Sequence, residues 1–365
     1  MTRDVNTDRL ELVWDRLNHW HHHDGVRAIS AETGSADGVA GDYYCGFDDI
    51  SGKILVNRDS RFLIASPTKP FIACAVMMLV EQGELKVSDR VSRYLPEFGK
   101  GDKSHIRIAH LLTHTSGLPD MLPNNLELRK KRAPLSEYQK YANKVDLVCP
   151  PGTRVHYQSM GILTLSTIIE AIISNPTSEF LAERIFEPLK MNATMLGATD
   201  ECLLSHKPPV DSMVEETEGH DQWGWNSRYW RMLGAPWGGL ISTSADLGTF
   251  CRHLLGIHQG HRGIISPATL LSMTTNQLGT FPKVPIAIAN SLPWGYGWQL
   301  NWPNHPRGFG SILPPESYGH WGATGTLIWI DPTCKAYGVV LTNEPMELEG
   351  RRQIEFANLS RIFWD

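Results

Sequence analysis

The chain of 365 residues lacks the features that would place it in several large classes of protein. It has no run of about 18 apolar residues, which a membrane-spanning helix requires. Its six cysteines include no Cys-x-x-Cys pair, which favours free thiols over a disulfide framework or a zinc ribbon. The net charge of -5 argues against a general binder of nucleic acid or of membrane surfaces. We therefore expect no nucleic-acid partner and no membrane span.

The first residues, "MTRDVNTDRLELVWDRL", mix acidic and basic side chains and lack the apolar core of a signal peptide. The sequence on this basis predicts a cytoplasmic protein and gives no indication of its oligomeric state. The cluster His19, His21, His22, His23 and Asp24 invites a metal site. Consecutive His side chains point in different directions on a helix, so we expect adventitious surface histidines, with no metal ion and no organic cofactor.

Hydrophobic periodicity predicts strands at both ends of the chain with helices between them. We expect an α+β fold in which an antiparallel sheet is flanked by N- and C-terminal helices and carries an inserted, mainly helical domain. The predicted sheet domain is discontinuous, and the active site is expected between the two domains. Their predicted bounds are residues 1–85 and 237–365 for the sheet domain and 86–236 for the helical domain. The predicted strands include 26–32, 39–47, 53–66, 294–300, 325–332 and 336–344, and the main predicted helices are 7–22, 66–81, 243–256, 266–276 and 347–362.

One short motif in this pattern, "SPTK", can carry chemistry. Ser66 and Lys69 are three residues apart at the start of a helix, so the Lys amine can reach the Ser hydroxyl on one helix face. A Ser hydroxyl needs a base to become a nucleophile, and a buried Lys with reduced proton affinity can serve as one. Pro67 suits the first helical position. The alternative is a Ser N-cap followed by an exposed Lys, and the spacing alone does not decide between them.

Two further stretches supply partners for this pair. Tyr157, in "PPGTRVHYQSMGILTL", follows a Pro-Gly turn and precedes an apolar helix, where its hydroxyl can relay a proton. Tyr141 with Asn143 matches a Tyr-x-Asn pattern more literally, but it falls in a polar, exposed helix. In "SYGHWGATGTLIWID", glycines lead into a strand and permit close backbone approach. A backbone N–H there, with that of Ser66, would form an oxyanion hole.

Taken together, these stretches resemble the serine β-lactamase-like superfamily, which includes class C β-lactamases, DD-peptidases and family VIII carboxylesterases. The resemblance covers about residues 25–345. It rests on five motifs in the expected order: "IASPTKPFIACAVMMLVEQGELKVSDRVSRYLPEF", "IRIAHLLTHTSGLP", "PPGTRVHYQSMGILTLSTIIE", "APWGGLISTSADLGTF" and "GHWGATGT".

The resemblance implies a role for each matching residue. Ser66 corresponds to the acylated Ser, Lys69 to its paired Lys and Tyr157 to the catalytic Tyr. The strand motif falls on His320, Trp321 and Gly322, and Ala323 takes the position whose N–H completes the oxyanion hole. The remaining correspondence is Trp237–Gly238–Gly239, which is similar to the Trp-Gly-Gly of the esterase branch.

Two departures from the superfamily pattern bear on the substrate. His320 stands where β-lactamases have Lys, and a His is mostly neutral near pH 7, so a fixed charge for a substrate carboxylate is lost. Ser159 stands where the Tyr motif usually ends in Asn. Both changes favour uncharged esters, and we expect a carboxylesterase that acts through a covalent acyl-enzyme on a small ester or amide. The alternatives are β-lactamase, DD-peptidase or acyltransferase activity on the same residues, and an inactive relative that binds or assembles.

Weaker signals favour packing roles. His110 and His114, in "HLLTH", lack the Glu of a zinc protease and are expected to pack inside the fold. Four tryptophans lie close together in an irregular stretch and could line an apolar pocket. They are Trp223, Trp225, Trp230 and Trp237.

Overall fold

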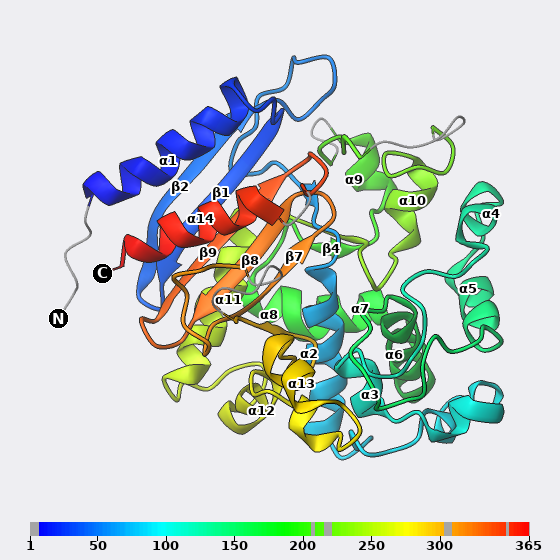
Figure 1. Cartoon of the computed structure of the whole chain (residues 1–365). Coiled ribbons are helices and arrows are strands. Elements are labelled where there is room, and N and C mark those ends of the chain that lie inside the picture. Colours follow the sequence, from blue (N-terminus) through cyan, green and yellow to red (C-terminus); the bar gives the residue numbers. More distant parts are fainter. Residues whose placement is uncertain (1–6, 206–208, 215–220, 303–308, 348–349, 365) are drawn as a thin grey trace.

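A computed structural model describes residues 7–205, 209–214, 221–302, 309–347 and 350–364. Its centre is a six-stranded antiparallel sheet in the order β2-β1-β9-β8-β7-β6 (Figure 1). Strands from the two ends of the chain meet where β1 pairs with β9, with Ile29 opposite Thr342. The strands are β1 (Ala28–Ser35), β2 (Gly38–Gly46), β6 (Gln299–Leu300), β7 (Tyr318–Gly322), β8 (Thr326–Asp331) and β9 (Ala336–Thr342).

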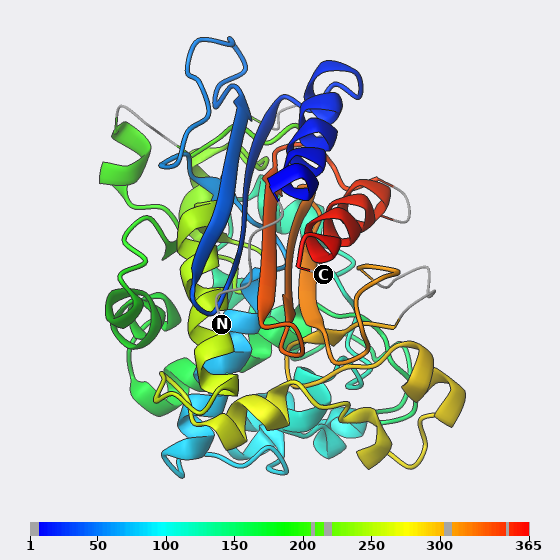
Figure 2. The ribbon, with the colours of Figure 1, turned by 90° about the vertical axis from the view of Figure 1, so that its left-hand side faces the viewer.

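Helices cover both faces of this sheet. The terminal helices α1 (Thr7–His22) and α14 (Arg351–Ile362) lie together on one face, and α11 (Ser244–His258) lies on the other (Figure 2). The apolar side of α1 is buried in the same cluster as Phe356 of α14 and Trp329 of β8. The predicted α+β fold, an antiparallel sheet flanked by terminal helices, is confirmed.

The chain between β2 and β6 is mainly helical. α2 (Thr68–Glu81) is almost wholly buried and packs against α6 (Met160–Ile173), which also contacts α3 (Ile108–Leu112) and α5 (Leu135–Ala142). A small second sheet pairs β3 (Phe62–Leu63), β5 (Leu240–Ser242) and β4 (Met195–Leu196) beside the start of α2. The other helices are α4 (Asn125–Lys130), α7 (Thr177–Leu181), α8 (Glu187–Leu189), α9 (Asp200–Leu204), α10 (Arg228–Leu233), α12 (Pro267–Met273) and α13 (Ile286–Ser291). Single helical turns of 3-10 type cover Val91–Arg93, Pro96–Phe98, Gly101–His105 and Leu278–Thr280, and a π-helical turn covers Ala182–Phe186.

Two strands predicted from hydrophobic runs are mostly turns in the structure. Within 53–66 only Phe62–Leu63 is a strand, because the Ser60 N–H donates to the Asn57 carbonyl and the Asn57 N–H donates to Ser60 Oγ, which closes a turn. Within 294–300 only Gln299–Leu300 is a strand, because the Gly295 N–H donates to the carbonyl of Trp298. Local polar bonds have replaced the extended conformation in both segments.

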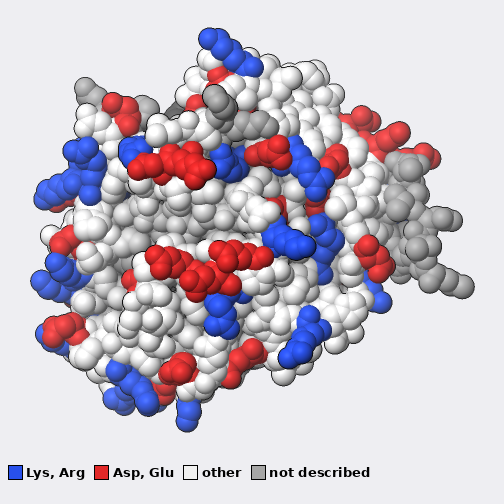
Figure 3. Space-filling view, turned by 180° about the vertical axis from the view of Figure 1, so that it is seen from behind, with Lys and Arg blue, Asp and Glu red and all other residues white. Residues whose placement is uncertain are grey.

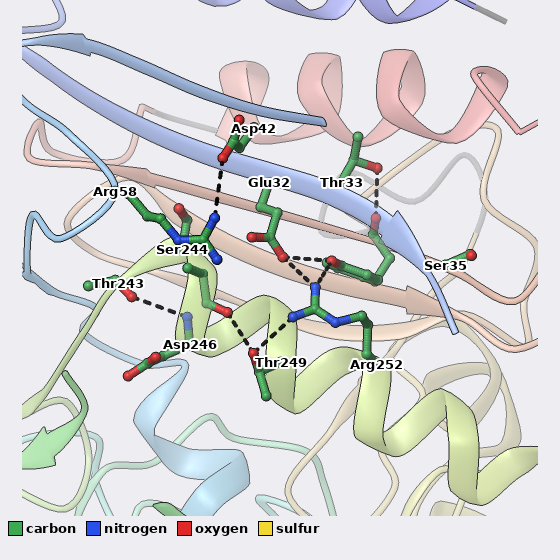
Figure 4. A network of polar contacts seen from close by, with 12 residues as sticks. Glu32, Thr33, Ser35, Asp42, Arg58, Thr243, Ser244, Asp246, Thr249 and Arg252 are labelled. Atoms are coloured by element: carbon green, nitrogen blue, oxygen red, sulfur yellow. Dashed lines mark hydrogen bonds and ion pairs between the residues drawn. The ribbon is translucent and has the colours of Figure 1, made fainter. Parts of the chain in front are cut away.

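A buried polar network joins α11 to the central sheet (Figure 4). Glu32 of β1 is fully buried and accepts hydrogen bonds from Arg252 Nη1 of α11 at 2.7 Å and from the Tyr337 hydroxyl of β9 at 2.6 Å. The helix approaches closely here because residue 248 is Gly, where any Cβ would overlap the Glu32 carboxylate. Side chains of both charge signs are interspersed over the face seen from behind (Figure 3).

Candidate active site

Ser66 lies in a tight turn between β3 and α2. The turn is closed by the Thr68 N–H, which donates to the carbonyl of Ala65 at 3.0 Å. Ala65 has a positive φ of 55°, an uncommon conformation for a residue with a Cβ. The helix begins at Thr68 after Pro67, and no side chain caps it. The reading of Ser66 as an N-cap is therefore wrong, and Pro67 stands one position before the first helical residue that we expected it to occupy.

Lys69 is held against Ser66 in the first turn of α2. Its Nζ lies 3.0 Å from Ser66 Oγ and donates to the backbone carbonyl of Trp237 at 2.7 Å. The side chain is 1% exposed, and burial lowers the pKa of Lys69 to about 7, with a weaker opposite effect of Asp120. Near neutral pH a large fraction of this amine is uncharged. In that form one N–H can remain on the Trp237 carbonyl while the lone pair faces the Ser66 hydroxyl.

Tyr157 lies over the same pair. Lys69 Nζ is 4.8 Å from the centre of the Tyr157 ring, and the Tyr157 hydroxyl is buried without a hydrogen-bond partner in the described part of the chain. Burial raises the pKa of Tyr157, the Ser66 hydroxyl opposes this, and the Asp120 carboxylate adds to it. The phenol is thus a neutral proton donor at physiological pH. Tyr141, by contrast, lies in α5 and is 44% exposed, as predicted from its polar surroundings.

His320, on β7, is fully buried and its ring centre lies 6.0 Å from that of Tyr157. Its Nδ1 lies 2.8 Å from the carbonyl of Trp321, an acceptor only, so Nδ1 must carry the hydrogen. Burial, reinforced by the nearby Lys69, lowers the pKa of His320 to about 3. The imidazole is therefore neutral, and its buried Nε2, which has no partner in the described residues, offers a lone pair rather than a positive charge.

The end of β7 packs directly against the turn that carries Ser66. Residue 322 is Gly, and a Cβ there would lie 2.5 Å from the carbonyl oxygen of Ile64 and 2.9 Å from the ring of Pro67. Thr324 and Thr326 fix the same contact through hydroxyl bonds to the carbonyls of Leu63 and Ile64. The backbone N–H groups of Ser66 and Ala323 donate to no acceptor among the described residues, so both remain available to a substrate oxygen.

The residues predicted to touch the substrate differ in what they offer. The hydroxyl of Ser159, 2% exposed, already donates to Asp120 Oδ1 at 2.7 Å, so only its lone pairs are free. The Trp321 ring stacks on Tyr157 with centres 5.9 Å apart, and Trp237 contributes its carbonyl to Lys69. Gly238 lies against Ala65, at ordinary contact distance for any added Cβ.

The family model named Beta-lactamase matches residues 24–359. The chain belongs to the Beta-lactamase family. A Salmonella agona protein named as a D-alanyl-D-alanine carboxypeptidase is 27% identical over 333 residues, which cover 83% of this chain and 73% of that protein. A penicillin-binding protein homologue from Caulobacter crescentus has a TM-score of 0.79 at 20% identity and covers 98% of both chains. EstCE1, a hydrolase with promiscuous acyltransferase activity, has a TM-score of 0.75 at 19% identity over 98% of both chains.

The chain therefore belongs to a family of hydrolases and has a fold similar to that of penicillin-binding proteins. The relatives are named for different activities. Family membership therefore fixes the scaffold and leaves the specific activity open. Substrate choice has to be argued from the side chains around Ser66.

Two residues near the site were not predicted to belong to it. His114 was expected only to pack, yet its buried ring lies 4.6 Å from the Tyr157 ring and its Nδ1 accepts the Gln158 N–H at 3.1 Å. Asp120 follows in the same "THTSGLPD" stretch. No local pattern distinguishes either residue, because both reach Tyr157 and Ser159 through contacts between segments some forty residues apart.

The Trp cluster surrounds a positively charged side chain. The Arg129 guanidinium lies 4.3 Å from the centre of the Trp230 ring, 5.2 Å from that of Trp223 and 5.9 Å from that of Trp225. Trp230 and Trp237 are buried, with ring centres 6.4 Å apart. Cation–π contacts with Arg129 account for much of this cluster, and an apolar pocket at this place stays a prediction.

The His cluster is spread over the end of α1. His19 stacks on His23 and lies 3.8 Å from Asp24, while His21 bonds to the carbonyl of Val26. Within the described ranges, no three His, Cys, Asp or Glu side chains come together as metal ligands. In the same ranges no helix is both long and apolar enough to cross a bilayer.

Proposed function

We propose that this protein is a serine carboxylesterase that forms a covalent acyl-enzyme on Ser66. The observation that supports this best is the contact of Ser66 Oγ with a fully buried amine, Lys69 Nζ, at 3.0 Å. Burial lowers the pKa of that amine to about 7, which matches the requirement for a general base at neutral pH. The base and the Tyr157 phenol lie at this hydroxyl, and the N–H groups of Ser66 and Ala323 belong to two segments that pack against each other, so each step of acyl transfer has a group to perform it.

In the acylation step, Ser66 Oγ forms a bond to the ester carbonyl carbon and its proton passes to Lys69 Nζ. The carbonyl electron pair moves to oxygen, where the N–H groups of Ser66 and Ala323 donate to it. When the pair returns, the bond to the alcohol breaks, and the alcohol leaves with a proton relayed by Tyr157 from Lys69. In deacylation water attacks the acyl carbon and gives a proton to Lys69 Nζ. The bond to Ser66 Oγ then breaks, Lys69 returns that proton to Ser66 Oγ, and the acid leaves.

A neutral ester fits this arrangement better than a β-lactam or a peptide terminus. Both of those carry a carboxylate, and His320, with its hydrogen committed to the Trp321 carbonyl, can offer it neither a charge nor a donor. The name of the Salmonella agona relative is the observation that favours a D-amino peptide as the second candidate. Acyltransfer to an alcohol in place of water would use the same groups.

The test is to incubate the wild type and Ser66→Ala with p-nitrophenyl butyrate, nitrocefin and a fluorophosphonate. We expect ester turnover and a mass gain at Ser66 in the wild type, and a loss of roughly a thousandfold or more in Ser66→Ala, with its thermal unfolding unchanged. Nitrocefin turnover well above ester turnover would assign a β-lactam substrate instead. A wild type that neither turns over an ester nor gains mass would be an inactive binding relative, and the proposal would fail.

A further inference from the structure

Asp120 lies beside the proposed reacting groups, and hydrogen bonds from Ser159 hold it in place. Its Oδ1 accepts a hydrogen bond from the Ser159 hydroxyl at 2.7 Å, and its backbone carbonyl accepts one from the Ser159 N–H at 3.2 Å. Ser159 is 2% exposed, so this attachment is a rigid one. Asp120 itself is only partly buried, and its Oδ2 makes no hydrogen bond to any described residue.

The charge of this carboxylate reaches the reacting atoms. Burial has the larger effect on both groups: it lowers the pKa of Lys69 and raises that of Tyr157. The Asp120 carboxylate raises the pKa of each of them. Asp120 is the carboxylate that acts on both of them. A substrate seated on Ser66 would therefore meet the same negative field.

The other free polar atoms around Ser66 do not offset this field. His320 presents the lone pair of Nε2, and the Trp237 carbonyl is already bonded to Lys69. The donors, which are the N–H groups of Ser66 and Ala323 and the Tyr157 hydroxyl, are neutral. Lys69, the cation that contacts Ser66, loses its charge in the form that acts as base.

We propose that Asp120 determines specificity at this site and selects esters that carry a positive charge over neutral esters, and these over esters that carry a carboxylate. The inference rests on the proposed esterase function of Ser66 and adds the substrate class to it. The competing account is that Asp120 only holds Ser159 in place. That role would affect all substrates alike, whereas an electrostatic role separates them by charge.

The experiment compares substrates of one shape and different charge. On the acyl side these are the p-nitrophenyl esters of 4-(trimethylammonio)butanoate, of its neutral isostere 5,5-dimethylhexanoate, and of glutarate, whose free carboxylate is the negative counterpart. On the alcohol side they are butyrylcholine, the ester of choline with butyric acid, and its neutral isostere 3,3-dimethylbutyl butyrate. We expect kcat/KM for the cationic member of at least one pair to exceed that for its isostere by about tenfold at low salt, and this preference to shrink as salt is added.

The variants separate charge from positioning. Asp120→Asn keeps an oxygen that can accept from Ser159 but removes the charge, and we expect it to abolish the preference while the neutral ester is still hydrolysed. Ser159→Ala keeps the charge and removes the attachment, so the sign of the preference should persist even if Asp120→Asn fails to fold. Asp37 is exposed in the β1–β2 turn, so Asp37→Asn removes the same net charge away from Ser66 and should leave the preference unchanged.

The outcomes distinguish this inference from the proposed function. If no ester is hydrolysed, the esterase function fails together with it. If neutral esters are hydrolysed but neither pair shows a preference for the cation, or if the preference survives in Asp120→Asn, the role of Asp120 is overturned and the esterase function stands.

Discussion

At the scale of the residue, the property that governs this site is the burial of one amine. Lys69 carries its charge in water at neutral pH but loses much of it here, because burial lowers its pKa from 10.5 to about 7. In the proposed mechanism the deprotonated form is the base, so kcat/KM for p-nitrophenyl butyrate should rise about tenfold per pH unit below 7 and level off above it. A pH profile between 5 and 9 with a neutral ester measures this.

Two variants assign that pH dependence to Lys69. Asp120 raises the pKa of Lys69, so Asp120→Asn should move the rising limb to lower pH. His320 has a pKa of about 3 and does not titrate in this range, so His320→Gln should keep the limb in place even though its rate is lower. A limb that disappears in His320→Gln would contradict the assignment, since the titrating group would then be the His.

At the scale of the element, the contact between the end of β7 and the Ser66 turn aligns the two proposed oxyanion donors. A Cβ at residue 322 would lie 2.3 Å from Thr326 Oγ1 and 2.5 Å from the Ile64 carbonyl oxygen, so Gly322→Ala must push the two segments apart. Loss of one aligned donor lowers a rate by about 100-fold or more. We expect a loss of kcat of this size, measured with p-nitrophenyl butyrate.

The matched control for this substitution is Gly279→Ala. Residue 279 has open space around it and no positive φ, so the added methyl meets nothing. Its kcat and midpoint of thermal unfolding should equal those of the wild type. If Gly322→Ala also retains full kcat, the β7 end does not set the geometry of the reaction.

The stretches that carry Ser66, Lys69, Tyr157 and His320 could be picked out because each is marked by local chemistry. The strand β7 itself was missed, because His320 was expected among the glycines that precede the strand at 325–332. A Pro at a helix start, a Pro-Gly turn and a Gly-rich strand entry leave signatures within about ten residues. The strands predicted over 53–66 and 294–300 were mostly wrong, since local hydrogen bonds close turns there and the pattern of apolar residues alone does not reveal such bonds.

The contributions of His114 and Asp120 could not be predicted for a different reason. His114 accepts a hydrogen bond from Gln158, and Asp120 one from Ser159, which are 44 and 39 residues further along the chain. Their roles follow from how the segment after α3 packs against the start of α6. No periodicity within either segment contains that information.

At the scale of the whole molecule, the sheet depends on segments far apart in the chain, and the Glu32 network is one of the bonds between them. Glu32 lies on β1, Tyr337 on β9 and Arg252 on α11, and the network joins the start and the end of the chain to the segment before the last strands (Figure 4). Burial raises the pKa of Glu32, opposed by its bonds to Tyr337 and Arg252. Tyr337 and Arg252, with a smaller contribution from Arg58, therefore favour the charged carboxylate against the cost of its burial.

Arg252→Met should consequently destabilise the fold by about 3 kcal/mol at pH 7, because it leaves a charge buried without its ion-pair partner. The folded-state pKa of Glu32 is above its unfolded value and would rise further in this variant. Protonation then favours the folded state, so the loss should shrink as the pH falls from 7 toward 5. Urea unfolding at both pH values measures the change.

The control is the double variant Glu32→Gln/Arg252→Met, which also removes the charge of Glu32. It should recover part of the lost stability at pH 7 and show little pH dependence of its own. Equal destabilisation of the single and double variants at pH 7 would mean that Arg252 stabilises the fold by packing on Tyr337 rather than by pairing with Glu32.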